Sequence, residues 1–216
     1  MEIALGISRF NPEKDSAPYI QDFSVSASAN QTILDTMLLA WQQDPTLSFR
    51  RSCRSSICGS CAVLINGKPS LACQTLISKA MERGSRIVLE PLPHFEQLKD
   101  LVVNLEPFFD SLKKIVPWVV LRDDYKGEMD AEVVRKLQDP AICILCGICE
   151  SSFNDTNEKR CAGWVKSARL AEDPRDALGK HRLRLLQVPR EILQLFIKEL
   201  PLACPKGITI SGNILA

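Results

Sequence analysis

Residues 50–61 of the chain read RRSCRSSICGSC, and a further cysteine, Cys73, follows twelve residues later. Small residues dominate this loop, so its backbone can wrap closely around a bound group and present N–H donors to it. Gly59 supplies a φ angle that residues with a side chain avoid. Three arginines flank the cysteines and place positive charge beside the thiolates, which lowers their pKa and offsets the charge of a bound cluster.

The cysteine spacing in this stretch is C-x4-C-x2-C followed by a distant fourth cysteine. This spacing is typical of plant-type 2Fe-2S ferredoxins. The predicted ligands of a 2Fe-2S cluster are therefore Cys53, Cys58, Cys61 and Cys73. Zinc is the weaker alternative, because structural zinc sites usually have two paired C-x2–4-C hooks.

A second group of cysteines has the spacing C-x2-C-x2-C, which is the triplet of bacterial ferredoxins. A 4Fe-4S cluster needs a fourth thiolate, and a remote Cys-Pro pair, Cys204-Pro205, fits that role. The predicted ligands of a 4Fe-4S cluster are Cys143, Cys146, Cys149 and Cys204. Cys161 remains without a partner, and one unpaired cysteine cannot hold a cluster.

Composition limits the classes of function. The 216 residues include 27 basic and 26 acidic side chains, and a net charge of +1 argues against nucleic acid as the main partner. With 45% hydrophobic residues the chain can form a core. The longest stretch without Asp, Glu, Lys or Arg, residues 55–67, is shorter than the roughly 20 residues of a membrane-spanning helix. No signal peptide is visible, so nine cysteines indicate metal ligands before disulfides.

The apolar pattern predicts an α+β protein with two domains. Residues 1–97 are expected to form a β-grasp, 2Fe-2S ferredoxin-like domain, and residues 98–216 an all-α ferredoxin-like domain that holds the 4Fe-4S cluster. The predicted strands are Glu2–Phe10, Ile20–Ala27, Ala62–Ile65, Leu71–Leu76 and Arg86–Leu92. The predicted helices include Gln31–Gln43, Glu128–Gln138, Lys166–Leu170, Leu178–Leu186 and Arg190–Leu200, and the helical period of Phe95–Ile115 is broken by Pro107.

Two further expectations concern individual side chains. The three tryptophans, Trp41, Trp118 and Trp164, are expected in the core. The charged run Arg182–Arg190 is expected on an exposed helix face or in an exposed connection.

Several strings of the chain resemble the iron–sulfur subunits of succinate dehydrogenase and fumarate reductase. In the family's order they are FRRSCR at 49–54, ICGSCA at 57–62, LAC at 71–73, PLPH at 91–94, CILC at 143–146, R-x3-DPRD at 169–176 and CPKG at 204–207. One departure is Ser56, where the family usually has Gly or Ala.

The resemblance implies an electron-transfer subunit. Family members pass electrons from a flavoprotein through 2Fe-2S and 4Fe-4S clusters to a 3Fe-4S cluster and then to quinone. The expected partner is a flavoprotein subunit that binds FAD and the dicarboxylate, together with either a membrane anchor or another redox subunit. This chain lacks a dinucleotide-binding glycine motif, so we expect no catalytic residue on it. The expected location is cytoplasmic, free or peripheral on the inner face of the membrane.

The resemblance breaks at the third cluster. The three cysteines that would bind 3Fe-4S are replaced by Phe153, Gln194 and Leu200, and Leu195 stands where the family has a His near the quinone. We therefore expect no 3Fe-4S cluster, and we expect Phe153, Leu195 and Leu200 to fill the space. Cys161 sits where the family usually has Pro.

Two other functions remain open at this point. The chain could carry electrons through two clusters in a different flavin-dependent oxidoreductase with a non-quinone acceptor. It could also be a redox-inert or zinc-binding scaffold. The substrate of the flavoprotein and the direction of electron flow stay unassigned.

Overall fold

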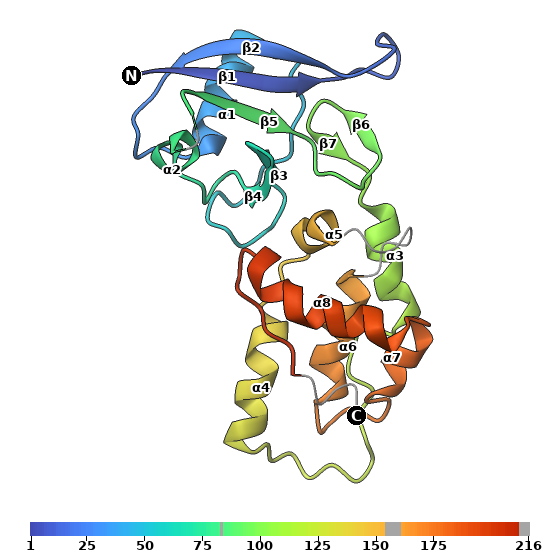
Figure 1. The fold of residues 1–216 in the computed structure, drawn as a ribbon. Helices are drawn as coiled ribbons and strands as arrows, with labels where there is room; N and C mark the ends of the chain where they lie inside the picture. Colours follow the sequence, from blue (N-terminus) through green and yellow to red (C-terminus); the bar gives the residue numbers. More distant parts are fainter. Residues whose placement is uncertain (83, 154–160, 212–216) are drawn as a thin grey trace. The chain divides into compact units, whose positions relative to one another are not determined.

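The computed structural model of the protein describes residues 1–82, 84–153 and 161–211 (Figure 1). The fold is α+β, and the chain divides into two compact units, Met1–Asn104 and Leu105–Ala216. Strands dominate the first unit and helices the second. The division falls seven residues later than the boundary expected after residue 97, because two short strands, β6 (Gln97–Lys99) and β7 (Val102–Val103), belong to the first unit.

The first unit is built on a mixed sheet with the strand order β2-β1-β5-β3-β4. The central strand β1 pairs antiparallel with β2 and parallel with β5, and Ala4 lies opposite Arg86. Alternate residues of β1, Ile3, Leu5 and Ile7, are fully buried, as expected for a strand with one face on the core. The strands are β1 (Glu2–Arg9), β2 (Tyr19–Ser26), β3 (Ala62–Ile65), β4 (Lys68–Leu71) and β5 (Arg86–Glu90).

Helix α1 (Ile33–Gln43) packs against this sheet and covers its apolar side chains. Thr32 and Asp35 form a capping box at its start, in which each side chain accepts the backbone N–H of the other residue. The helix buries Ile33, Met37 and Ala40 in the core. The short helix α2 (Ile77–Met81) contacts β5.

The hairpin β3–β4 turns at Asn66-Gly67, and its second strand begins earlier than expected. Asn66 and Gly67 both have positive φ angles, 47° and 76°, which is the backbone of a two-residue hairpin turn. Such a turn starts the second strand at once, so Ile65 lies opposite Lys68. The prediction of a strand at Leu71–Leu76 is therefore wrong, because the strand begins three residues earlier, at Lys68.

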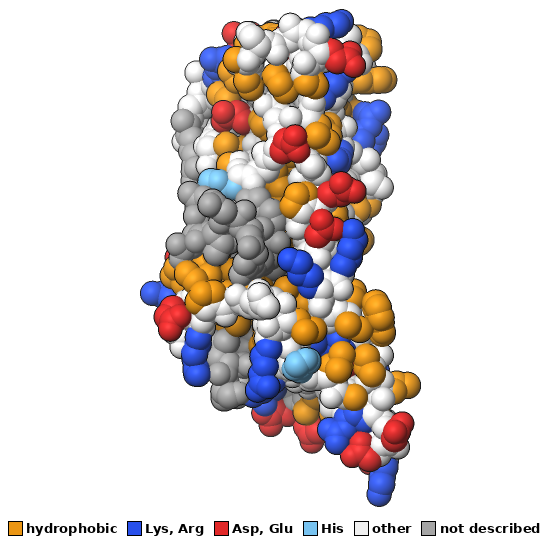
Figure 2. All heavy atoms as spheres, turned by 90° about the vertical axis from the view of Figure 1, so that its right-hand side faces the viewer, with side chains coloured by type: hydrophobic (Ala, Val, Ile, Leu, Met, Phe, Trp, Pro, Cys, Tyr) orange, Lys and Arg blue, Asp and Glu red, His pale blue; other side chains and the backbone are white. Residues whose placement is uncertain are grey.

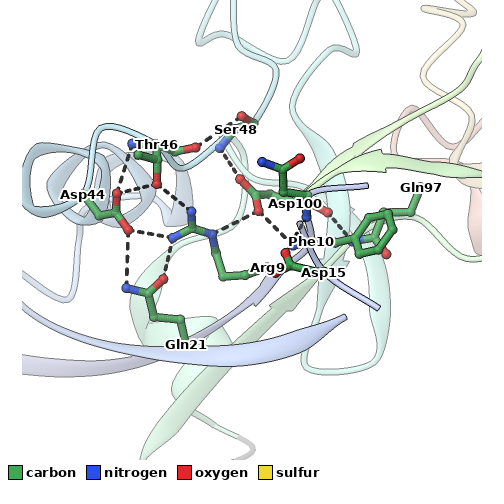
Figure 3. A network of polar contacts seen from close by, with 10 residues as sticks. Arg9, Phe10, Asp15, Gln21, Asp44, Thr46, Ser48, Gln97 and Asp100 are labelled. Carbon is green, nitrogen blue, oxygen red and sulfur yellow. Dashed lines mark hydrogen bonds and ion pairs between the residues drawn. The ribbon is translucent and has the colours of Figure 1, made fainter. Parts of the chain in front are cut away.

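A buried arginine ties β6 and β7 to the sheet (Figure 3). Arg9 at the end of β1 donates through Nε to Asp100 at 3.0 Å and through Nη1 to Asp44 at 2.8 Å. Asp100 also accepts the backbone N–H groups of Phe10 and Ser48, at 2.9 and 2.7 Å. Asp100 lies in the turn between β6 and β7, so this network attaches residues 97–103 to the first unit.

The second unit is a group of helices around α6 (Cys161–Ala171), which contacts α3, α4 and α7. Pro107 lies in the first turn of α3 and does not break it, because the helix begins at Glu106 and proline is well tolerated at that position. The other helices are α3 (Glu106–Lys114), α4 (Ala131–Ala141), α5 (Ile148–Ser152), α7 (His181–Leu185) and α8 (Arg190–Ala203).

Three side-chain expectations are wrong. Arg182 is 0% exposed rather than part of an exposed face, and its guanidinium donates to the backbone oxygens of Ile115 and Trp118 and pairs with Asp176. Of the tryptophans, Trp164 is buried in the core, whereas Trp118 is 63% exposed and Trp41 37% exposed. Local hydropathy does not predict that Arg182 pairs with the buried carboxylate of Asp176 inside the unit.

Two surface properties bear on partners. Within the residues that the structure describes, no helix is long and apolar enough to cross a membrane. Figure 2 shows basic and acidic side chains mixed over the visible face, in keeping with the near-zero net charge.

Candidate metal centres

The first candidate centre lies in the first unit, in the loop between α1 and β3. The structure brings its four cysteines to one end of the β3–β4 hairpin. Cys61 directly precedes β3 and Cys73 follows β4, and the backbone N–H of Cys73 donates to Cys61 Sγ at 3.4 Å. Cys61 and Cys73 are buried, whereas Cys53 and Cys58 are exposed on the loop.

Backbone N–H groups of this loop point at sulfur. Cys53 Sγ accepts the N–H groups of Ser55, Ile57 and Cys58 at 3.3–3.4 Å. Cys73 Sγ accepts the N–H of Ser56 at 3.3 Å. Amide donors of this kind stabilise negative charge on thiolates, which is what an iron–sulfur cluster requires of its surroundings.

Left-handed backbone conformations produce this arrangement. Arg54, Ser56 and Gly59 have φ angles of 57°, 58° and 71°. Only glycine adopts such angles without a steric cost. The conformation explains why a small residue suits position 56, and Ser56 adopts it while its N–H reaches Cys73.

The electrostatics of the two kinds of cysteine differ. Backbone hydrogen bonds, that of Ser55 first, lower the pKa of Cys53 to about 6. Burial raises the pKa of Cys61 to about 12. The sequence analysis expected the neighbouring arginines to lower the thiol pKa, but the leading causes at Cys53 are amide groups. Arg51 instead stacks over Trp41, 5.2 Å from the ring centroid.

The second candidate centre lies entirely in the second unit. Cys143, Cys146 and Cys149 run from the end of α4 into α5, and Cys204 is the residue that ends α8. All four line one cavity, whose remaining walls include the apolar side chains of Phe108, Val165 and Leu200. The chain thus brings together two segments that are 55 residues apart between Cys149 and Cys204.

The loop of the second centre repeats two features of the first. Leu145 and Gly147 have positive φ angles, 54° and 79°. Backbone N–H groups of Leu145 and Ile148 hydrogen-bond the side chains of Cys143 and Cys146. The same kind of amide donor therefore faces sulfur in both units.

Burial is the leading cause of the raised pKa values of Cys143 and Cys146. It raises the pKa of Cys146 to about 12 and that of Cys143 above its ordinary value. Lys166 opposes the shift at Cys143, and its Nζ donates to the carbonyl oxygen of that residue at 3.4 Å. These sulfurs stay protonated at neutral pH until a metal replaces the protons.

Cys161 is the residue that the sequence analysis set aside and that the structure brings to the second centre. It is the first residue of α6, is 1% exposed, and lines the same cavity as the four cysteines above. Burial and the adjacent Cys149 raise its pKa well above the ordinary value. In the sequence, the one signal for its role was its expected position at the start of a helix. In the structure, that position lies near α5.

The three positions that the resemblance assigns to the third cluster differ in burial. Phe153 and Leu200 are buried, whereas Gln194 lies on the exposed side of α8. Leu195 is 37% exposed, so the expectation that it fills the interior is wrong. Its neighbour Phe196 is the buried residue, and it packs against Phe153 and Trp164.

In the described part of the chain, no group of three or more His, Cys, Asp or Glu side chains is already arranged to hold a metal ion. The fit of the two cysteine sets to iron–sulfur clusters rests on the chemistry of the donors: four sulfurs in each set, with backbone N–H groups directed at sulfur.

Comparisons with known proteins agree with this chemistry. Residues 4–110 match a family described as a 2Fe-2S iron–sulfur cluster binding domain. The succinate dehydrogenase iron–sulfur subunit of Coxiella burnetii (strain RSA 493 / Nine Mile phase I) is 33% identical, over 95% of this chain and 91% of that protein. The mitochondrial succinate dehydrogenase (ubiquinone) iron–sulfur subunit 1 of Oryza sativa subsp. japonica is 35% identical, over 96% and 78%.

A solved structure has the same fold. A chain of the Mycobacterium smegmatis Sdh1 complex in the apo form superposes with a TM-score of 0.76 at 24% identity, and the match covers 99% of this chain and 92% of that one.

Proposed function

The chain belongs to the family of succinate dehydrogenase iron–sulfur subunits, and we propose that it carries electrons between a flavoprotein subunit and an acceptor through one 2Fe-2S and one 4Fe-4S cluster. The observation that carries the proposal is a set of four cysteines in each unit, with backbone N–H groups directed at sulfurs of each set. When bound, each cluster would act as a one-electron carrier. The proposal assigns FAD, the dicarboxylate and all catalytic residues to the partner.

The first unit is assigned as a β-grasp, 2Fe-2S ferredoxin-like domain with the ligands Cys53, Cys58, Cys61 and Cys73. Cys61 and Cys73 would bind the 2Fe-2S cluster on its buried side, and Cys53 and Cys58 would bind it on the side that faces solvent. The amides of Ser55, Ile57 and Cys58 offset negative charge at the exposed sulfur of Cys53, which favours the reduced state.

The second unit is assigned as an all-α ferredoxin-like domain with the ligands Cys143, Cys146, Cys149 and Cys204. Cys204 attaches the end of α8 to the loop before α5, so metal binding couples to the packing of the whole unit. Apolar residues of the cavity wall surround the sulfurs, and Lys166 supplies a positive charge near Cys143.

We further propose that no 3Fe-4S cluster is present. The three corresponding positions hold Phe153, Gln194 and Leu200, and none of these can bind iron as a thiolate does. Electrons would then leave from the second unit to a membrane-anchor or other redox subunit. The complex would lie on the cytoplasmic side, peripheral to the membrane where it has an anchor.

The experiment is anaerobic purification of the chain with its native partners, followed by addition of succinate and freezing for EPR. We expect a flavoprotein to co-purify and succinate to reduce the 2Fe-2S cluster. The chain purified alone is the control, and it should be reduced by dithionite but not by succinate. A complex whose clusters are reduced by dithionite, but are neither reduced by succinate nor reoxidised by fumarate, would contradict the assignment to this type of oxidoreductase.

A further inference from the structure

A fifth cysteine faces the second centre. Cys161 is almost completely buried and lines the cavity that is bounded by Cys143, Cys146, Cys149 and Cys204. Its side chain hydrogen-bonds with that of Cys149. This contact joins Cys161 to one member of the proposed ligand set.

A buried carboxylate fixes the position of Cys161. The backbone N–H of Cys161 donates to Oε2 of Glu150 at 2.9 Å, and Glu150 is itself buried in α5 next to Cys149. This contact connects the first residue of α6 to α5. Helices α5 and α6 therefore position the two sulfurs next to each other. The buried side chains of Trp164 and Val165 hold α6 in its place.

We propose that Cys161 is a reserve ligand of the second cluster, able to take the place of Cys149 at the same iron; the inference rests on the ligand set proposed above. In the exchange, a bond forms between Cys161 Sγ and iron while the bond between Cys149 Sγ and iron breaks. The proton leaves Cys161 and is taken up by Cys149, so no electron is transferred and no further reactant is needed.

The chemistry favours this role over that of an inert core residue. A buried free cysteine usually behaves as a small hydrophobe packed among apolar side chains. Cys161 instead contacts the thiol of Cys149, at the wall of the cavity that the four proposed ligands also line. The replacement for Cys149 would need only a small change of position, since the two side chains are already in hydrogen-bonding contact.

Four alanine variants of the full chain test the proposal after anaerobic reconstitution with iron and sulfide: Cys149→Ala, Cys161→Ala, the double variant and Cys146→Ala. We expect Cys149→Ala to keep about six irons per chain and to show the EPR signal of a 4Fe-4S cluster after reduction. The same result is expected for Cys161→Ala. The double variant should lose that signal. Cys146→Ala is the matched control, and it should lose the 4Fe-4S signal although Cys161 is present.

The proposal is overturned if Cys149→Ala loses the four-iron signal to the same extent as Cys146→Ala, or yields a 3Fe-4S signal in its place. Cys149→Ser is a second, milder variant, and its helix content by circular dichroism reports folding. The 2Fe-2S signal of the first unit measures the amount of loaded chain in every sample. Failure of the wild-type chain to take up a 4Fe-4S cluster would instead overturn the proposed ligand set itself, so the two failures are distinguishable.

Discussion

The ring of Phe153 packs edge-on against the ring of Phe196, with 5.7 Å between the centroids and 79° between the ring planes. Trp164 lies against both rings, at 5.7 Å from Phe153 and 4.6 Å from Phe196. The resemblance to the family implies that Phe153 stands at one of the 3Fe-4S ligand positions. An aromatic core therefore surrounds that position in this chain.

The first prediction concerns this core. Phe153→Ala should lower the free energy of unfolding of the second unit by about 3–5 kcal/mol, because the substitution leaves a cavity among the buried rings of Trp164 and Phe196. Anaerobic urea unfolding followed by circular dichroism measures the change. Leu195→Ala, at an exposed neighbouring position, is the control and should change stability by about 0.5 kcal/mol or less. Equal effects of the two variants would show that Phe153 is not part of the core.

The second prediction separates the two centres. Cys58→Ser should remove the rhombic or axial 2Fe-2S EPR signal and leave the 4Fe-4S signal, because all four cysteines of each set lie within one unit. Ser60→Ala changes the side chain that lies 3.1 Å from Cys58 Sγ and should keep both signals. An unchanged 2Fe-2S spectrum in Cys58→Ser would remove Cys58 from the ligand set.

The third prediction concerns the pH dependence of Cys53. Since backbone hydrogen bonds lower its pKa to about 6, Cys53 is a reactive thiolate above that pH and an unreactive thiol below it. In the metal-free chain, iodoacetamide labelling of Cys53 should therefore rise with a midpoint near pH 6. Cys61, whose pKa burial raises to about 12, should stay unlabelled up to pH 9. Mass spectrometry locates the labels, and a midpoint near pH 9 at Cys53 would show that its amide hydrogen bonds do not persist without metal.

The fourth prediction concerns the buried arginine of the second unit. Arg182→Ala should destabilise this unit by about 3–5 kcal/mol, because it leaves the buried Asp176 carboxylate without its positively charged partner and three backbone carbonyl oxygens without their donor. Arg184→Ala removes an exposed arginine from the same helix and should have an effect within about 0.5 kcal/mol. Thermal unfolding monitored by circular dichroism compares the two. A similar melting temperature for both variants would contradict a structural role for Arg182.

Much of the first unit could be predicted from local patterns. The period-two pattern of β1 and β2 and the amphipathic pattern of α1 each have one buried face, so hydropathy alone located them to within two residues. Strand β3 lies where it was expected, but β4 begins directly after the Asn66-Gly67 turn and not at the apolar run that follows. Strands β6 and β7 are too short to give a periodic signal, and a long-range contact between Asp100 and Arg9 fixes their place.

The cysteine spacing located the two candidate centres, but the spacing says nothing about side chains that arrive from elsewhere. Cys161 reaches the second cavity because Glu150 and the packing of α6 place it there. Arg182 is buried for the same kind of reason, since Asp176 and carbonyl oxygens of residues 115–118 surround it. Each of these contacts joins segments whose proximity is a property of the folded unit.

The measurement that tests the account most directly is EPR of the anaerobically purified chain, as isolated and oxidised, together with iron analysis. Oxidised 3Fe-4S is paramagnetic, whereas oxidised 2Fe-2S and 4Fe-4S clusters are silent. Two clusters predict about six irons per chain, no near-isotropic 3Fe-4S signal before reduction, and both remaining signals after dithionite. Air must be excluded, because it can strip one iron from a 4Fe-4S cluster. A stoichiometric 3Fe-4S signal with about nine irons per chain would contradict the two-cluster account.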